Sequence, residues 1–249
     1  MTDRWLQVLP NAEAASRRAA DVIAGRLLSA VAARGGFRMA LSGGATPIAL
    51  FEALAAMSLP WKQVEIYQVD ERVAPHGSAQ RNLTAIEATL GRTGTTIVAM
   101  PVESGDLPSA ARRYEKMLPG VFDLVHLGLG FDGSTASLFP DDPALDISDR
   151  SVALCGPYHG TARMTLTYRG LSKAAEILWF ITGADKAAPL ARLCAADSTL
   201  PAARVVSEQM RVVTDTAAAS ALEAHPAAGV HLWHRDASHE GVPSAFKPT

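Results

Sequence analysis

The stretch GLGFDGSTASLFP, residues 128–140, decides the fold, because it follows an apolar run and begins with closely spaced glycines. The run before it, FDLVHL at 122–127, has the length and character of a buried strand. Residues 128–133 satisfy the pattern G-x-G-x-x-G, which in dinucleotide-binding proteins joins a strand to a helix. A strand that ends in a glycine turn indicates an α/β protein.

The remainder of the chain alternates between expected strands and helices. Asn11 is expected to cap a helix that runs to about Arg34 and ends at Gly35 and Gly36, and Thr46-Pro47 to open a later helix. The expected strands are 5–9, FRMALS (37–42), VEIYQVD (64–70), TTIVAM (95–100), SVALC (151–155), RMTLTY (163–168), EILWFITG (176–183) and MRVVTD (210–215). Further helices are expected at 82–90, 107–118, 185–195 and 216–224, an edge strand at HLWH (231–234) and a flexible tail at 235–249.

This alternation predicts one three-layer α/β domain over residues 1–249, with a mostly parallel, Rossmann-like sheet and helices on both faces. The net charge of −2 gives no support for a nucleic-acid partner, and no run of apolar residues is long enough to span a bilayer. Cys155 and Cys194 lie far apart, in no metal or redox spacing. We expect a soluble cytoplasmic protein, monomeric or a small homo-oligomer, that binds neither nucleic acid nor a membrane.

The glycine turn at 128–133 does not fit a dinucleotide site. The pattern lies in the middle of the chain, and Asp146 and Asp149 precede the next expected strand instead of ending it. A nucleophile elbow, G-x-S-x-G around Ser134, is also excluded, because positions 132 and 136 hold aspartate and alanine. Ser134 therefore has the pattern of a helix N-cap or a first-turn hydroxyl.

LSGGATP, residues 41–47, is a candidate phosphate cradle. Gly43 and Gly44 leave backbone N–H groups free between a strand and a helix, and Ser42 and Thr46 add hydroxyl donors. The loop lacks the lysine of a nucleotide P-loop. A tight turn that needs glycine for positive φ is the alternative interpretation.

Charged residues lie near the ends of three other expected strands. VDER at 69–72 brings Asp70, Glu71 and Arg72 to the rim of the sheet, and Arg163 and Lys186 lie close to strand ends. The carboxyl ends of parallel strands share one edge, where ligands bind in such sheets. Each charge alone is typical of a solvated surface, but together with the glycine loop they are able to neutralise a phosphate.

Taken in order, LSGGATP, VDER with Asn82 downstream, FDLVHLGLGFDGSTASLFP, RMTLT and ITGADKA resemble the 6-phosphogluconolactonase family, over about residues 5–225. That family lies within the glucosamine-6-phosphate isomerase/deaminase-like group. The resemblance implies hydrolysis of 6-phospho-D-glucono-1,5-lactone in the oxidative pentose phosphate pathway, without metal or organic cofactor. It further implies that the loop 42–46 and Lys186, with Arg163, hold the phosphate, and that Asp70, Glu71 and Arg72 line the lactone end.

One position departs from the family motif G-x-D-G-H-T-A-S-L-F-P, whose histidine is the favoured general base. Here Ser134 stands in its place, and an unassisted serine hydroxyl cannot act as that base. Three alternatives stay open for the missing base. A carboxylate (Asp132, or Asp70 or Glu71) activates the water, another histidine (His126, His76 or His159) does so, or the chain is catalytically weak.

Two other functions compete with lactone hydrolysis. A non-catalytic phosphosugar-binding pseudoenzyme fits the loss of the histidine at Ser134 and the retained cradle. A glucosamine-6-phosphate deaminase-like isomerase is less favoured. It requires the same histidine and an acidic residue shortly after it, whereas this chain has SLFP and no acid until Asp141.

Overall fold

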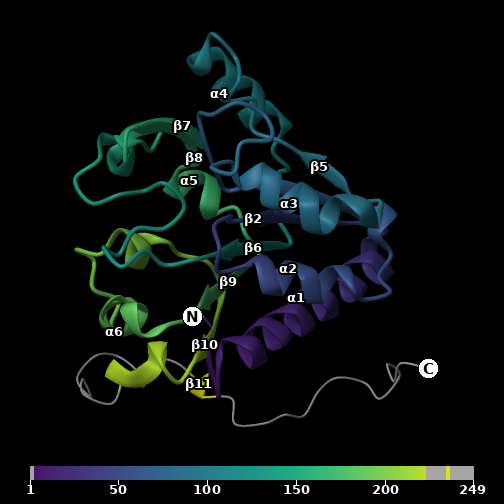
Figure 1. Ribbon diagram of the computed structural model, residues 1–249, viewed down its shortest axis with the longest axis vertical. Coiled ribbons are helices and arrows are strands. Elements are labelled where there is room, and N and C mark those ends of the chain that lie inside the picture. The colour runs from purple at the N-terminus through teal and green to yellow at the C-terminus, as the bar shows by residue number, and fades with distance from the viewer. Residues whose placement is uncertain (1–2, 223–233, 236–249) are drawn as a thin grey trace.

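The computed structural model describes residues 3–222 and the backbone of 234–235 (Figure 1). Its main sheet has eight strands in the order β11-β1-β10-β9-β6-β2-β3-β5, and every neighbouring pair is parallel. The strands are β1 (Asp3–Leu9), β2 (Phe37–Leu41), β3 (Val64–Gln68), β5 (Thr96–Val98), β6 (Leu124–Leu127), β9 (Glu176–Ile181), β10 (Gln209–Asp215) and β11 (His234–Arg235). The chain runs outward from β2 to β5 and then returns to β6 on the other side of β2, so the topology switches between β2 and β6.

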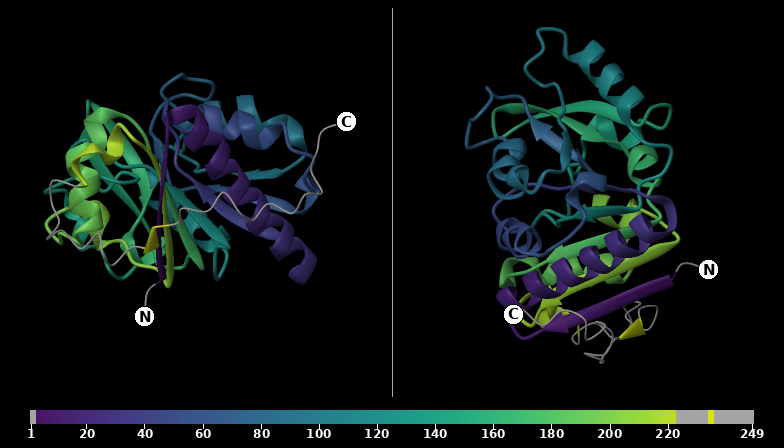
Figure 2. Two further views of the ribbon diagram at one scale, coloured as in Figure 1. Left: turned by 90° about the horizontal axis from the view of Figure 1, so that it is seen from below. Right: turned by 90° about the vertical axis from the view of Figure 1, so that its right-hand side faces the viewer.

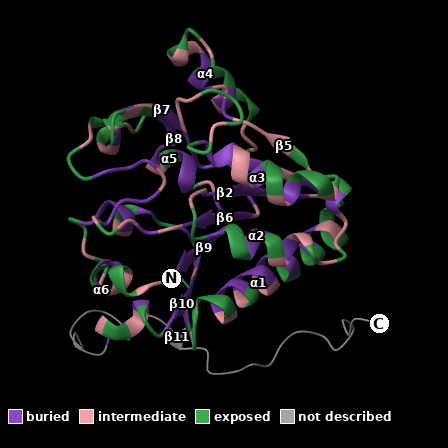
Figure 3. Cartoon of the chain, in the orientation of Figure 1, coloured by how far each residue is buried: buried purple, intermediate pink, exposed green. Residues whose placement is uncertain are grey.

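Helices cover both faces of this sheet, as Figure 2 shows. The helices are α1 (Ala12–Arg34), α2 (Ile48–Ala55), α3 (Asn82–Leu90), α4 (Leu107–Met117), α5 (Tyr168–Leu171) and α6 (Ala187–Cys194). One apolar cluster packs α1, α2 and α3 on the sheet, and the other includes the buried faces of α4 and α6. Figure 3 shows the resulting division, with buried residues toward the sheet and exposed ones outward. The predicted α/β fold is confirmed.

The ends of α1 follow the predicted capping chemistry. The Asn11 side chain accepts a hydrogen bond from the Ala14 N–H at 2.9 Å, and Gly35 ends the helix with φ +76°. The predicted start of α2 is wrong by one residue. Pro47 holds the cap position, Thr46 supplies no cap bond, and the helix begins at Ile48.

A second, three-stranded antiparallel sheet was not predicted. It contains β4 (Asp70–Arg72), β8 (Thr161–Leu166) and β7 (Val152–Tyr158), in that order. Only His159 and Gly160 separate β7 from β8, too few residues for the crossover that a parallel pair needs. The expected strand 64–70 is accordingly divided between the two sheets, with β4 pairing to β8.

The last predicted elements are only partly described. Residues 218–221 form a short 3₁₀ helix where a longer helix was expected, while 223–224 lie outside the described residues. The expected edge strand at 231–234 is represented by β11, which pairs with β1, and 231–233 and 236–249 lie outside the description. The other 3₁₀ turns are Trp61–Gln63, Gly91–Thr93, Pro143–Asp146, Ala184–Lys186 and Pro201–Arg204. No helix within the described ranges is long and apolar enough to cross a bilayer.

Candidate active site

A cavity of about 350 Å³ lies where the topology switches, at the carboxyl ends of β2 and β6. The two strand ends are tied together by the Ser42 N–H, which donates to the His126 carbonyl at 3.2 Å. The walls come from the loops after β2, β6 and β9 and from the β7–β8 hairpin. This is the position at which ligands bind in open α/β sheets.

The structure brings all but one of the predicted site residues to this cavity. Those that line it are Ser42, Gly43, Gly44, Thr46, Asp70, Arg72, Asp132, Ser134, Arg163 and Lys186. The exception is Glu71. Because neighbouring side chains in a strand point to opposite faces, Asp70 and Arg72 face the cavity and the residue between them faces away.

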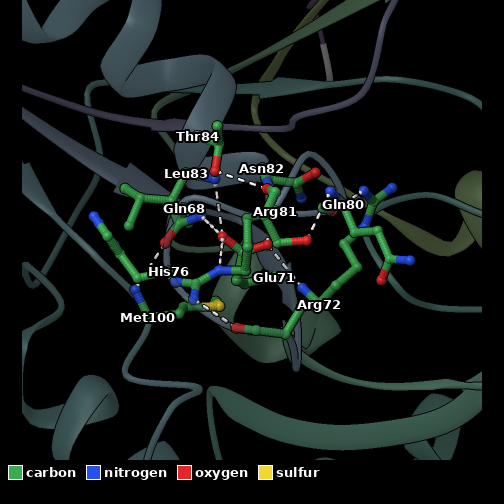
Figure 4. A network of polar contacts seen from close by, with 12 residues as sticks. Gln68, Glu71, Arg72, His76, Gln80, Arg81, Asn82, Leu83, Thr84 and Met100 are labelled. Carbon is green, nitrogen blue, oxygen red and sulfur yellow. Dashed lines mark hydrogen bonds and ion pairs between the residues drawn. The ribbon is translucent and has the colours of Figure 1, made fainter.

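The placement of Glu71 at the lactone end is therefore wrong. Figure 4 shows its carboxylate enclosed in a polar network beneath the start of α3. The carboxylate accepts hydrogen bonds from the Gln68 side chain and from the backbone N–H groups of Arg72, Asn82 and Leu83. It also pairs with Arg81 at 3.0 Å, and both side chains are almost fully buried. Glu71 thus anchors the segment that carries Arg72 and Asn82.

The glycine turn after β6 arranges Asp132 and Ser134 as a hydrogen-bonded pair. Asp132 Oδ1 accepts from the Ser134 hydroxyl at 2.6 Å and from the Ser134 N–H at 3.0 Å. A Cβ on Gly130 would lie 2.4 Å from this oxygen and 2.2 Å from the serine Oγ, so only glycine leaves room for the pair. Gly133 closes the turn with φ +84°.

Asp132 has a third hydrogen-bond donor, which the sequence did not reveal. The Tyr158 hydroxyl, at the end of β7, donates to Asp132 Oδ2 at 3.1 Å. Burial by itself raises the pKa of Asp132, but the hydrogen bonds from Ser134 and Tyr158 outweigh it and lower the pKa below its ordinary value. Asp132 therefore stays ionised at neutral pH and lines the cavity.

An aromatic stack supports this corner of the site. The rings of Phe139 and Tyr158 are stacked with centroids 3.8 Å apart, and the Arg163 guanidinium lies 5.2 Å and 5.5 Å from the two centroids. Burial, and then the charge of Arg72, lower the pKa of Arg163. Since the hairpin was not predicted, no sequence signal identified Tyr158.

Asp70 lies deeper in the cavity wall. Its carboxylate accepts hydrogen bonds from Ser137 Oγ at 2.6 Å and from Asn82 Nδ2 at 3.1 Å. Burial raises its pKa, although the bond from Ser137 and the charge of Arg72 act in the opposite direction. Asn82 also fills the space beside Gly43, where a Cβ would lie 2.3 Å from the amide.

Lys186, in the 3₁₀ turn Ala184–Lys186, is a further cation of the cavity lining. It follows β9 and forms an ion pair with the exposed Asp185 at 2.8 Å, while its own side chain is only 18% exposed. Lys186 lines the same cavity as the glycine loop 42–46 after β2. A cation beside free backbone N–H groups is the arrangement that binds a phosphate.

The three candidate histidines differ in position. His126 is buried between Phe51 and Phe180, and burial lowers its pKa to about 3, so it is a very weak base. His76 lies 3.9 Å from Glu103, outside the cavity lining. His159 is exposed at the hairpin tip, lines the cavity and packs its ring edge-on against Tyr158.

Several buried polar atoms on the cavity wall have no hydrogen-bond partner within the described part of the chain. They are Ser42 Oγ, Arg72 Nε, Asn82 Oδ1, Arg163 Nε and both ring nitrogens of His126. Buried polar groups in native proteins are nearly always satisfied, so their concentration here indicates a polar ligand. No group of three or more potential metal ligands occurs among the residues described.

Known proteins resemble the chain in both sequence and fold. Residues 10–214 match the family model described as glucosamine-6-phosphate isomerases/6-phosphogluconolactonase. A 6-phosphogluconolactonase of Nostoc sp. is 36% identical over 206 residues, which is 77% of this chain and 85% of the relative. One of Synechocystis sp. is 33% identical over 225 residues, 84% of this chain and 93% of the relative. The crystal structure of a 6-phosphogluconolactonase from Shewanella baltica shares the fold, with a TM-score of 0.79 at 23% identity, over 86% of this chain and 98% of that one.

Proposed function

Because the chain belongs to the glucosamine-6-phosphate isomerase/6-phosphogluconolactonase family, we propose that it hydrolyses 6-phospho-D-glucono-1,5-lactone to 6-phospho-D-gluconate. This reaction is the second step of the oxidative pentose phosphate pathway. The observation that carries the proposal is the cavity wall, where buried polar atoms of Ser42, Arg72 and Arg163 point to a polar, anionic ligand. The protein is accordingly an enzyme, a carboxylic ester hydrolase.

We assign the phosphate to the glycine loop 42–46, Lys186 and Arg163, all of which line the cavity. The loop 42–46 offers backbone N–H groups and two hydroxyls, and Lys186 adds a positive charge. Arg163 adds a planar guanidinium whose orientation is held by the stacked rings of Phe139 and Tyr158. Anchoring the phosphate fixes the position of the lactone carbon within the cavity.

The lactone end is assigned to the wall formed by β4 and the turn after β6. Attack of water on the lactone carbonyl places a negative charge on the carbonyl oxygen. Arg72 carries the positive charge for that oxygen, and its Nε has no partner within the described residues. Asp70, two residues before Arg72 on β4, accepts hydrogen bonds from Asn82 and Ser137 and so holds the Asn82 side chain in place.

One observation disfavours the isomerase. The position that follows the glycine turn, where a deaminase needs its acidic residue, is occupied by the apolar sequence Leu138-Phe139-Pro140. Phe139 is buried and stacked on Tyr158, so the aromatic pair fills that side of the site. The pseudoenzyme remains the second candidate, because Ser134 stands where the family motif has its histidine.

We further propose that the enzyme works in the cytoplasm, as a monomer or a small homo-oligomer, and without a metal or organic cofactor. A phosphorylated sugar lactone is charged, so it remains in the compartment in which it is made. Activation of water by side chains is sufficient for an ester of this reactivity.

The test generates 6-phosphogluconolactone with glucose-6-phosphate dehydrogenase and follows its disappearance with and without the protein. We expect acceleration above spontaneous hydrolysis that is proportional to protein concentration. Binding of 6-phosphogluconate without acceleration would identify the pseudoenzyme. Absence of both binding and acceleration would reject the substrate class.

A further inference from the structure

The turn after β6 holds a carboxylate, Asp132, two residues before Ser134, the position at which the family motif has its imidazole base. From its position in the cavity and its three hydroxyl and amide donors, we propose that Asp132 is the general base that activates the hydrolytic water. Ser134 and Tyr158 are positioning residues that act through it. This inference rests on the proposed lactone hydrolysis.

The Asp132 carboxylate is both oriented and accessible. Ser134 binds Oδ1 through its hydroxyl and its N–H, and Tyr158 binds Oδ2, so the turn and the hairpin together hold the carboxylate plane. An ionised carboxylate has about four acceptor sites, so these three donors leave room for a water hydrogen. Asp132 is half-buried and belongs to none of the ion pairs in the described chain, so no cation neutralises it directly.

Because Ser134 stands where the family motif has histidine, Asp132 has a hydroxyl donor beside it in place of an imidazole base. In the family motif the histidine follows the Asp-Gly pair, whereas here Ser134 can only donate its hydroxyl hydrogen to Asp132. The hydroxyl is too weak a base to take a proton from water at neutral pH. The carboxylate next to it is a stronger base and is already deprotonated, since its pKa lies below the ordinary value.

The proposed step conserves protons and electrons. The Asp132 carboxylate accepts a proton from water while the water oxygen bonds to C1 of the lactone, and the carbonyl electron pair moves onto its oxygen. The bond from C1 to the ring oxygen then breaks as the carbonyl forms again. Asp132 returns the proton to the ring oxygen, which becomes the C5 hydroxyl. The product carboxylic acid ionises to solvent.

Other carboxylates and histidines fit this role less well. Asp70 has a raised pKa and both of its oxygens are bound inside the wall, and Glu71 faces away from the cavity. His126 is buried with a pKa of about 3, and His76 lies outside the cavity lining. His159 is the one rival among the described residues, because it lines the cavity beside Tyr158.

The two bases predict different dependences of the rate on pH. An enzyme whose general base is a histidine with an ordinary pKa loses activity as the pH falls through about 6.5, because the imidazole becomes protonated. Asp132, with its lowered pKa, keeps its charge until the pH falls below the ordinary aspartate range of about 4. The titratable and charged groups that share the cavity with Asp132 are Asp70 and Arg72 of β4, Tyr158 and His159 of the hairpin, Arg163 of β8 and Lys186 after β9. Two further carboxylates, Asp141 and Asp142, line a neighbouring pocket that Asp132 also lines.

The experiment measures kcat and kcat/KM for 6-phosphogluconolactone between about pH 3 and pH 7.5, together with binding of 6-phosphogluconate. We expect wild type to show no loss of kcat near pH 6.5, and Asp132→Asn to lose ~10²–10⁴-fold in kcat while it still binds 6-phosphogluconate. The matched control is Asp146→Asn, an exposed aspartate outside the cavity lining, which should match wild type. Ser134→Ala and Tyr158→Phe should each move the acidic limb to higher pH, because each removes a bond that lowers the Asp132 pKa.

Three results would overturn the assignment. These are a wild-type kcat that falls through pH 6.5, an Asp132→Asn enzyme within threefold of wild type, or a His159→Asn enzyme that loses activity to the extent expected for Asp132→Asn. The wild-type pH profile decides the matter even if a variant fails to fold. A wild type that does not accelerate hydrolysis at all is a failure of the proposed function, and is distinguished by that first measurement.

Discussion

Arg72 on β4 lies directly opposite Arg163 on β8, in the register of the antiparallel pair. Like charges in this position destabilise a sheet, and burial together with the charge of Arg72 lowers the pKa of Arg163. Both Nε atoms are buried on the cavity wall without a partner in the described chain. A phosphorylated ligand would bring the anionic charge that this pair lacks, so binding and stability should be coupled.

The first prediction follows from this pair. Arg163→Ala removes a charged hydrogen-bond donor worth about 1.5–3 kcal/mol, so KM for the phosphorylated lactone should rise roughly 10- to 150-fold. The increase in Tm that 6-phosphogluconate produces in wild type should become much smaller. Arg150→Ala is the control, because Arg150 is exposed and pairs with Asp149 away from the cavity. An unchanged KM would place the phosphate elsewhere.

The second prediction concerns Lys186. Lys186→Ala removes a cation of the cavity lining that we assign to the phosphate, so the enzyme should lose most of its preference for the phosphorylated lactone over glucono-1,5-lactone. Rates with the two lactones measure that preference. Lys116→Ala, in the last turn of α4 and exposed, should leave it unchanged. Equal loss with both lactones would mean that Lys186 acts at the lactone end.

The third prediction separates Glu71 from the chemistry. Glu71→Ala breaks the buried ion pair with Arg81, which keeps only its pair with the exposed Glu103, and it removes the acceptor of the buried Leu83 N–H. This should reduce the free energy of unfolding by about 3–5 kcal/mol. Urea unfolding at neutral pH measures the change. Glu13→Ala, which disrupts an exposed pair with Arg17, should cost less than about 1 kcal/mol. A stable Glu71→Ala protein that loses activity would contradict the structural role.

The fourth prediction is a dependence of stability on pH. Burial raises the pKa of Asp70 in the folded protein above its value in the unfolded chain. The folded state therefore loses stability as the pH rises from the unfolded pKa through the folded pKa, because the buried carboxyl group must ionise. Asp70→Asn should therefore be more stable than wild type at pH 7.5, and the difference should vanish below about pH 4.

Asp106 provides the comparison of opposite sign. It caps α4 and its pKa is lowered by its hydrogen bonds with Ser109, so its stabilisation is present at neutral pH and is lost as the pH falls. Asp106→Asn should be the less stable protein at pH 7.5. Calorimetric Tm values of both variants across pH check the two signs. A lower Tm for Asp70→Asn at pH 7.5 would show that Arg72 and Arg163 stabilise the charged form.

Much of the fold was predictable because its signals are local. Asn11 and Gly35 bound a helix through side-chain and backbone chemistry that the sequence displays. The antiparallel hairpin was not predictable in the same way, since alternation alone does not state which strands pair. The position of Tyr158 beside Asp132 depends on that pairing, and it therefore had no signal in the sequence.

The site shows the same division. Strand ends in a parallel sheet meet at one edge, and this brings Ser42, Asp132 and Lys186 together as expected. The expectation for Glu71 is wrong because the run VDER by itself indicates one charged cluster, whereas a strand turns every second side chain to the other face. The period of two in the strand 70–72 separates Glu71 from its neighbours.

The central claim is that this cavity hydrolyses a phosphorylated sugar lactone. The most direct test compares kcat/KM of the wild-type protein for 6-phosphogluconolactone and for glucono-1,5-lactone at one neutral pH, each corrected for spontaneous hydrolysis. The account predicts clear acceleration of the phosphorylated lactone and a preference for it of at least about tenfold, since one charged phosphate contact contributes about 1.5–3 kcal/mol. Equal acceleration of the two lactones, or none of either, would contradict it.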